Sequence, residues 1–209
     1  MRLFFFSILF LSVNLHSFAQ EIKNDSVIYL KAIVKGEKSN ERIRKIKTKG
    51  EELASTFEGG IKSRVCLVSG VPEGELQSVK LYFNNGLINL AKKSLKVEYK
   101  DTEIRLVMYE AGTGDLPGAA LINKDVRFIV KASHKGALEL DLSPLKIKTQ
   151  GKFFIGIELL EDTGEYTPIV LKVVANNDGI TYIRNTKNPD WNRDTNFPNQ
   201  IKLELKIIQ

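Results

Sequence analysis

Residues 126–142 read VRFIVKASHKGALELDL, and this stretch decides the fold class. Apolar side chains occupy every second position from Val126 to Val130 and again from Leu138 to Leu142. A period of two places these side chains on one face of an extended strand. The residues between the two runs are turn-like. Each run therefore predicts a β-strand with one buried face and one solvated face.

The same alternation extends in both directions, over residues 104–108 and 201–207. The segments 153–160 and 168–174 are apolar on both faces, which is typical of central strands between two layers. Clusters of glycine, proline and asparagine separate the runs, and the only candidate helical turn is 87–95. Many short strands joined by such turns predict an all-β fold, an antiparallel β-sandwich that is jelly-roll-like.

Shorter apolar runs complete the expected set of strands, at 27–34, 62–68, 78–83 and 95–99. Pro72-Glu73-Gly74 is a turn signal, so we expect a turn that separates the strand at 62–68 from the strand at 78–83. The alternation also predicts which side chains form the core. They are Leu81, Phe83, Leu106, Met108, Phe128, Leu140, Ile155, Ile157 and Leu203.

The first 19 residues have the composition of a secretory signal peptide. Met1-Arg2 is a positive start, residues 3–13 are almost wholly apolar, and Ser17-Phe18-Ala19 offers small residues where a signal peptidase reads. The apolar run is too short to cross a bilayer of about 30 Å as a helix. We therefore expect a secreted chain that begins at Gln20 and keeps no membrane span. The alternative is an anchor that is never removed.

The rest of the 209-residue chain suits a single domain. We expect an N-terminal strand and basic segment over 20–49, followed by the sandwich over 50–209. The net charge of +6 is mostly interspersed, but residues 35–49 hold seven basic and two acidic side chains. An exported protein seldom meets nucleic acid, so anionic glycans or lipid head groups are the partners to consider. The alternative is a solvated face.

A series of motifs over residues 43–160 resembles a secreted β-sandwich module of Gram-negative bacteria that often accompanies a carboxypeptidase-like regulatory domain. The motifs are Gly50–Phe57, Ser78–Phe83, Ile104–Glu110, Leu116-Pro117-Gly118, Val126–Val130, Leu140–Ser143 and Phe153–Glu158. The resemblance implies a jelly-roll-like fold similar to galactose-binding and carbohydrate-binding modules, in the periplasm or on the outer cell surface. The module has no established activity, so it implies no catalytic residues. No convincing carboxypeptidase-like domain precedes it here.

Few residues in this chain suit catalysis. His134 is the only histidine after the leader, and it lies in a turn-like stretch, which argues against a zinc site and against Ser–His chemistry. Cys66 is the only cysteine, and its apolar strand predicts a buried, inert thiol. Glu158 interrupts another apolar strand and needs a partner, for which Arg105 and Arg127 are the candidates. We expect a structural ion pair, with a catalytic acid as the alternative.

Two loops offer oxygen ligands of the kind that calcium prefers. Asp115 lies in a glycine-rich loop, and Asn176, Asn177 and Asp178 lie in another. Neither run matches an EF-hand, and Asn-Asp-Gly is also a common tight turn. We expect no cofactor, with structural calcium as the open alternative.

Trp191 is the only tryptophan of the chain, and it lies among Asn188, Asp190, Asn192 and Arg193. Sugars stack on exposed aromatic rings, while amides and carboxylates bond to their hydroxyl groups. These five residues are therefore the expected ligand site. The loop precedes the last strand, so we expect it at one end of the sandwich. The alternative is a tryptophan lid that plugs the open end.

Three classes of function compete, and a secreted non-catalytic binding module for a glycan or another cell-surface ligand is preferred. A structural or interaction protein of the bacterial cell envelope is the alternative. An enzyme is disfavoured because histidine and cysteine chemistry is nearly absent. An exposed Trp191 beside a hollow would favour the binding module, and a flat apolar sheet face would favour the structural protein.

The exported protein should lack residues 1–19. Intact-mass spectrometry of periplasmic or secreted material should give a chain that begins at Gln20. Recovery of the full-length mass from that fraction would contradict the prediction.

Overall fold

The computed structural model describes residues 27–33, 42–57, 59–85, 96–161, 166–195 and 199–209. The expected signal peptide, residues 35–41 of the basic segment and the candidate helical turn at 87–95 lie outside these ranges. Within the described residues, no helix is long and apolar enough to cross a membrane.

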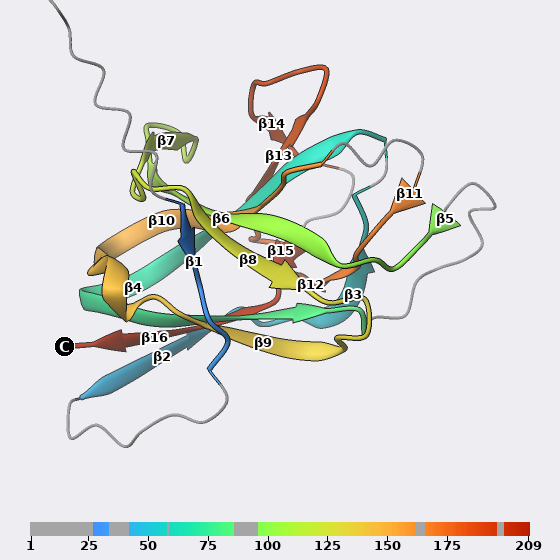
Figure 1. Ribbon diagram of the computed structural model, residues 1–209. Coiled ribbons are helices and arrows are strands. Elements are labelled where there is room, and N and C mark those ends of the chain that lie inside the picture. Colours follow the sequence, from blue (N-terminus) through green and yellow to red (C-terminus); the bar gives the residue numbers. More distant parts are fainter. Residues whose placement is uncertain (1–26, 34–41, 58, 86–95, 162–165, 196–198) are drawn as a thin grey trace, which may run out of the picture.

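Strands make up most of the described chain (Figure 1). A short 3₁₀ helix, η1 (Ser143–Leu145), follows β9. The strands are β1 (Ile28–Tyr29), β2 (Ile43–Lys47), β3 (Glu51–Ser55), β4 (Ile61–Phe83), β5 (Lys96–Val97), β6 (Thr102–Ala111), β7 (Pro117–Ala120), β8 (Val126–Val130), β9 (Gly136–Asp141), β10 (Lys148–Leu159), β11 (Tyr166–Thr167), β12 (Leu171–Ala175), β13 (Thr181–Asn185), β14 (Asn192–Arg193), β15 (Asn199–Ile201) and β16 (Leu203–Ile208).

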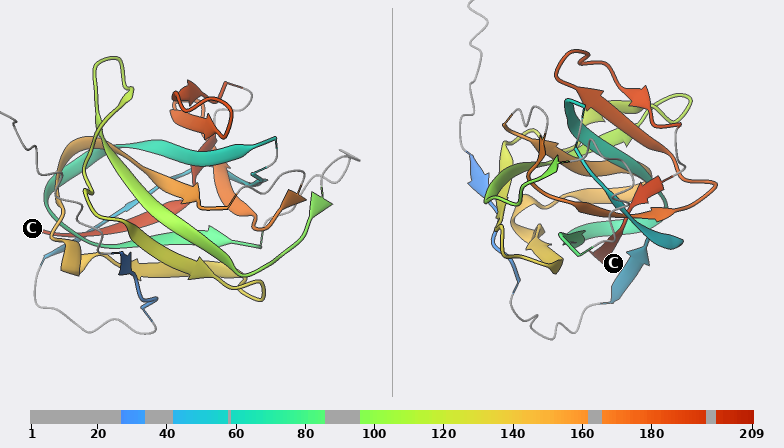
Figure 2. Two further views of the ribbon diagram at one scale, coloured as in Figure 1. Left: turned by 45° about the horizontal axis from the view of Figure 1, so that its top comes forward. Right: turned by 90° about the vertical axis from the view of Figure 1, so that its right-hand side faces the viewer.

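Two layers of strands face each other (Figures 1 and 2). The upper layer has the order β1, β8, β6, β10, the first half of β4, β13 and β14. The lower layer has the order β9, the second half of β4, β16 and β2. β12 lies between β3 and β15 and meets the end of β4. Most pairs are antiparallel, so the predicted all-β antiparallel sandwich is confirmed.

β4 belongs to both layers. Its 23 residues would extend over about 75 Å, whereas a domain of this size is roughly 45 Å across. The strand must therefore bend, and it passes from one layer to the other. Gly70 supplies a positive φ of 68° near the bend, and Gly151 of the paired strand β10 supplies one of 73°. The register between β10 and β4 shifts on both sides of Gly151, as expected where strands turn a sandwich corner.

The expected break at Pro72-Glu73-Gly74 is wrong, because β4 runs through it without interruption. Proline can occupy a strand where the sheet bends, since no regular ladder bond is then lost. Gly74 is needed at this corner, because a Cβ there would lie 2.3 Å from the carbonyl oxygen of Ile208 on β16. These residues therefore bend one strand and do not separate two.

The core lies between the two layers. On β10, Ile155 and Ile157 are buried in this core, whereas Phe154 packs in a separate cluster on the outer face. This alternation follows from the period of two. The predicted core is confirmed for each of its nine members, which are Leu81, Phe83, Leu106, Met108, Phe128, Leu140, Ile155, Ile157 and Leu203.

The N-terminal segment supplies strands to the same sandwich. β1 pairs in parallel with β8, and β2, from the basic stretch, pairs with β16. The described part of residues 20–49 is thus hydrogen-bonded into both layers.

Replacing Phe128 with Ala should lower the free energy of unfolding by about 3–5 kcal/mol, because the ring is 2% exposed and packs against Phe83. Urea titration measures this loss. Ile129→Ala is the matched control, since the neighbouring side chain is 46% exposed and its truncation should cost about 0.5 kcal/mol or less. Equal losses in the two variants would show that the face assignment is wrong.

Candidate functional site

A row of side chains crosses the outer face of the upper layer. The register places Arg105 of β6 opposite Glu158 of β10, and Glu158 opposite Ser63 of β4. Arg105 is also opposite Arg127 of β8, and Ser63 is opposite Arg184 of β13. Directly opposed side chains have Cβ atoms about 5 Å apart. Five strands therefore bring these five residues, here named the charged row, into one line.

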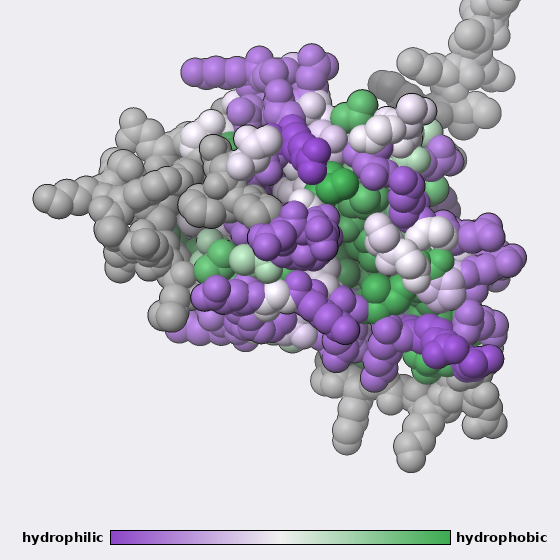
Figure 3. Space-filling view, turned by 180° about the vertical axis from the view of Figure 1, so that it is seen from behind, coloured by the Kyte–Doolittle hydropathy of each residue, from purple (hydrophilic) through white to green (hydrophobic). Residues whose placement is uncertain are grey.

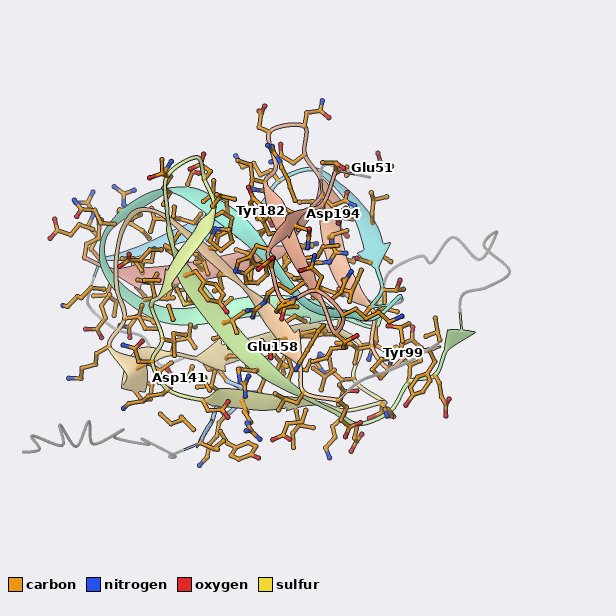
Figure 4. All side chains as sticks on the ribbon, turned by 90° about the horizontal axis from the view of Figure 1, so that it is seen from above. Glu51, Tyr99, Asp141, Glu158, Tyr182 and Asp194 are labelled. Carbon is orange, nitrogen blue, oxygen red and sulfur yellow. The ribbon has the colours of Figure 1, made fainter. Side chains whose placement is uncertain are left out.

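Glu158 lies at the centre of the charged row, on the layer that faces the viewer in Figure 4. Its side chain is only 10% exposed. Oε1 accepts a hydrogen bond from Arg105 Nη1 at 3.1 Å and lies 3.8 Å from Lys62 Nζ. Oε2 accepts hydrogen bonds from Ser63 Oγ at 3.2 Å and from Arg184 Nη2 at 3.1 Å. A buried carboxylate is costly unless its oxygens are bonded, and here both oxygens have donors.

Asp125 lies next to Arg105 and Arg127, at the end of the charged row away from Arg184. Its carboxylate accepts hydrogen bonds from Arg127 and from Arg105, and the Arg105 Nε bond is 2.8 Å long. These bonds, from Arg127 first and Arg105 second, hold the pKa of Asp125 well below its usual range. Arg127 also lies 3.5 Å from Glu103. The expected arginine partner of Glu158 is thus confirmed for Arg105, whereas Arg127 pairs with Asp125.

The guanidinium group of Arg184 contacts two aromatic residues, Tyr109 and Trp191, and the carboxylate of Glu158. Its guanidinium carbon lies 4.2 Å from the centre of the Trp191 ring. Its Nη2 donates to Tyr109 Oη at 3.2 Å and to Glu158. The rings of Tyr109 and Trp191 meet edge to face, with their centres 5.3 Å apart. Stacking and hydrogen bonding together fix the plane of the guanidinium group.

A buried ion pair anchors the β13–β14 hairpin that carries Arg184. Arg64 Nη1 lies 2.7 Å from Asp194 Oδ2, and the two side chains are 6% and 11% exposed. The backbone N–H of Asp194 donates to the carbonyl of Thr181 at 2.9 Å. Tyr182, on the same hairpin, packs edge to face on Phe154 of β10. Figure 4 shows Tyr182 and Asp194 close to each other, and β4 lies between this hairpin and β10, which carries Glu158.

A pocket of about 250 Å³ opens beside Glu158 and Arg184. This volume is below the roughly 300–1,000 Å³ of sites for drug-sized ligands, so the pocket suits one sugar ring or a smaller group. Asn185 is one of the lining residues, and its Oδ1, which is closed off from solvent, has no hydrogen-bond partner among the described residues. The lining residues are Lys62, Ser63, Glu158, Arg184, Asn185, Thr186 and Pro189.

Trp191 lies beside this pocket, but it is not among the residues that line it. The ring is half-buried and packs on an outer cluster formed by Val65, Leu67, Val107, Phe154 and Tyr182. The loop therefore covers the outer face of the upper layer (Figure 2), and the expected position at one end of the sandwich is wrong. The cause is the antiparallel pairing of β13 with β4, which the sequence pattern did not reveal.

The other predicted ligand residues partly brace their own loop. Asn188 Oδ1 accepts a hydrogen bond from the backbone N–H of Asp190 at 3.0 Å. Asn192 Nδ2 donates to the Asp190 carbonyl at 2.9 Å. All three side chains are exposed, as is Arg193. The structure thus brings the loop to a pocket, but Lys62, Arg184 and Asn185 line that pocket in place of the predicted amides.

A second hollow, of about 310 Å³, lies between β2, β4 and the 176–178 turn. Several of its polar groups are already engaged. Asn176 Nδ2 donates to Gln200 Oε1, and Gln200 Nε2 donates to the carbonyl of Leu67, both at 2.9 Å. Lys47 Nζ lies 2.8 Å from Glu204. Because these contacts hold the edge together, the pocket beside Glu158 is the better candidate site.

The predicted calcium ligands lie in two different loops. Asp115 pairs with Lys152, and Asn176 Oδ1 accepts a hydrogen bond from the backbone N–H of Asp178. Asn177 lies between them in the β12–β13 turn. Across the described ranges, no group of three or more histidine, cysteine or acidic side chains could hold a metal ion. The geometry therefore lends the calcium hypothesis no support.

The two residues considered for nucleophilic chemistry lie in structural positions. Cys66 is buried in the core, and burial raises the pKa of its thiol to about 12. His134 lies in the turn between β8 and β9, where Nε2 is 3.4 Å from the carbonyl oxygen of Gly136. The prediction of a buried thiol is confirmed.

Arg184 is the main site residue that the sequence analysis missed. Its segment, Thr181 to Asn185, begins with three residues that favour strands and follows an Asn-Asp-Gly turn, so a strand signal was present. No comparable signal marks Lys62 as its neighbour, because β4 and β13 are far apart in the sequence and the pairing is non-local.

Comparison with protein-family models, with curated proteins and with solved structures finds no match for the chain.

Replacing Asp125 with Asn should lower the urea midpoint at pH 7, because Arg105 and Arg127 would then lie side by side without their shared carboxylate. The folded-state pKa of Asp125 is depressed, so its contribution is full above the unfolded value of about 3.9 and is lost as the pH falls toward the folded value. The difference between wild type and variant should therefore shrink below about pH 4. Asp101→Asn, which removes an exposed pair with Lys131, is the control and should have a smaller effect. A variant with the wild-type midpoint at pH 7 would refute the role given to Asp125.

Proposed function

We propose that this chain is a secreted, non-catalytic glycan-binding module. The observation that carries the proposal is the pocket beside the stacked Arg184. Its rim is polar, its floor is the outer face of a rigid sheet, and a loop with the only tryptophan lies next to it. Carbohydrate sites combine convergent hydrogen-bonding groups with aromatic rings in this way.

The hydrogen bonds of the pocket favour binding over catalysis. A glycosidase needs two carboxylates that face each other across the substrate, about 5 to 9.5 Å apart. Among the described residues, Glu158 is the only carboxylate that lines this pocket. Both of its oxygens already accept hydrogen bonds. The Ser63 hydroxyl donates a hydrogen bond to Glu158, and the described residues that line the pocket include no histidine.

The resemblance to a secreted β-sandwich module of Gram-negative bacteria is a second support, and it favours the periplasm or the cell surface as the location. The alternative function, a structural protein of the envelope, would be favoured by a broad apolar face. The large exposed apolar side chains are instead scattered over several elements. Those described are Val27, Tyr29, Ile43, Tyr99, Leu116 and Ile129. Figure 3 shows hydrophobic residues on one side of the molecule as a narrow band framed by hydrophilic ones.

A glycan array probed with the purified mature protein should identify at least one bound glycan. Thr186→Phe should then abolish binding of that glycan, because Thr186 is exposed on the pocket rim and a phenyl ring there would fill the opening. Thr113→Phe is the matched control, since Thr113 is exposed in the β6–β7 loop and does not line the pocket. An array without any bound glycan, or equal binding by both variants, would refute the proposed function or its site.

A further inference from the structure

We infer that the pocket beside Glu158 selects acidic sugars, and that it binds the carboxylate of a uronic or sialic acid through Arg184 and Lys62. The inference rests on the proposed glycan-binding function and names the class of sugar.

The charges of the site do not balance. The cations of the linked network are Lys62, Arg105, Arg127 and Arg184, and its anions are Glu103, Asp125 and Glu158. Four positive charges thus meet three negative ones, and one positive charge remains.

The position of the surplus charge follows from the pairing. Arg127 and Arg105 are both bonded to Asp125, at the end of the row away from the pocket. Within the described parts of the chain, Lys62 and Arg184 have only Glu158 as a carboxylate partner, and they share it with Arg105. The unbalanced charge therefore lies at the pocket, where a ligand anion would neutralise it.

Lys62 and Arg184 differ in how firmly they are held. Arg184 is fixed by Trp191, Tyr109 and Glu158, so its guanidinium plane is set before a ligand arrives. A guanidinium group matches the two oxygens of a carboxylate, and pre-positioning lowers the entropic cost of binding. Lys62 is 41% exposed and its ion pair with Glu158, at 3.8 Å, is the longest of the three. Its ammonium group is thus free to turn toward a ligand.

The hydrogen-bonding groups of the pocket wall are a reason to expect a sugar acid and not a bare carboxylate. Asn185 and Thr186 line the pocket next to Arg184. An amide and a hydroxyl group can bond to ligand hydroxyl groups near the carboxylate, and uronic and sialic acids carry both groups.

The test uses pairs of glycans that differ in one charged group. Oligogalacturonate is compared with its methyl ester, and sialyllactose with lactose. Binding to the mature protein is followed by the fluorescence of Trp191, which is the only tryptophan of the chain and stacks on Arg184. The acidic member of at least one pair should bind at least about tenfold more tightly than its neutral partner, because charge-assisted hydrogen bonds contribute that much. This preference should weaken as salt is added.

Three variants locate the effect. Arg184→Lys keeps the charge but loses the planar guanidinium group with its paired donors, and it should weaken binding of the acidic glycan about tenfold. Lys62→Gln should weaken it several-fold and reduce the salt dependence. Lys131→Gln removes another exposed lysine, which pairs with Asp101 away from the pocket, and it should bind like the wild type.

The outcomes separate this inference from the proposed function. If neutral and acidic partners bind equally, or if a sulfated glycan is preferred, the acidic-sugar inference fails and the glycan-binding function stands. If acidic glycans bind but both Arg184→Lys and Lys62→Gln bind like the wild type, the assigned site is wrong. If no member of either pair binds while the array identifies a different neutral glycan, only the inference fails. If the array also shows no binding, both fail.

Discussion

Both layers of the sandwich are hydrogen-bonded to one strand. The first half of β4 pairs with β10 and β13, and the second half pairs with β9 and β16. The corner between the halves exists because so long a strand cannot stay straight in a domain of this size. Gly70, Gly74 and Gly151 allow the backbone to bend there without steric conflict. The site residues Lys62 and Ser63 are therefore attached to the same strand as the core, which makes the floor of the pocket rigid.

The upper layer presents two different faces because its strands alternate. On β10, Ile157 is buried in the core and its neighbour Glu158 lies in the charged row outside. Gly156 lets β10 lie close to β4, since a Cβ at this position would lie 1.9 Å from the carbonyl oxygen of Arg64. A carboxylate can occupy this nearly closed position because three hydrogen-bond donors and the ammonium group of Lys62 surround it.

The pocket depends on contacts between elements that are distant in sequence. The ion pair of Arg64 and Asp194 holds the β13–β14 hairpin against β4, and the outer cluster supports Trp191. Trp191 in turn fixes Arg184, so the tryptophan acts on the site by positioning a cation. In this geometry the Trp191 ring contributes to recognition through Arg184. The guanidinium group of Arg184 covers part of the ring surface that the sequence predicts for stacking on a sugar.

The sequence by itself determined the all-β class, the faces of the main strands, the buried thiol of Cys66 and the need of Glu158 for an arginine. These features follow from alternation and from the cost of burying a charge, both of which are local. Only the tertiary structure decided that 62–68 and 78–83 form one bent strand, that Arg184 is opposite Ser63, and that the Trp191 loop covers a sheet face. Register and strand order depend on pairings between residues that are far apart in the sequence, such as Arg184 with Ser63 and Ile208 with Ile43, and a period of two is the same for every such pairing.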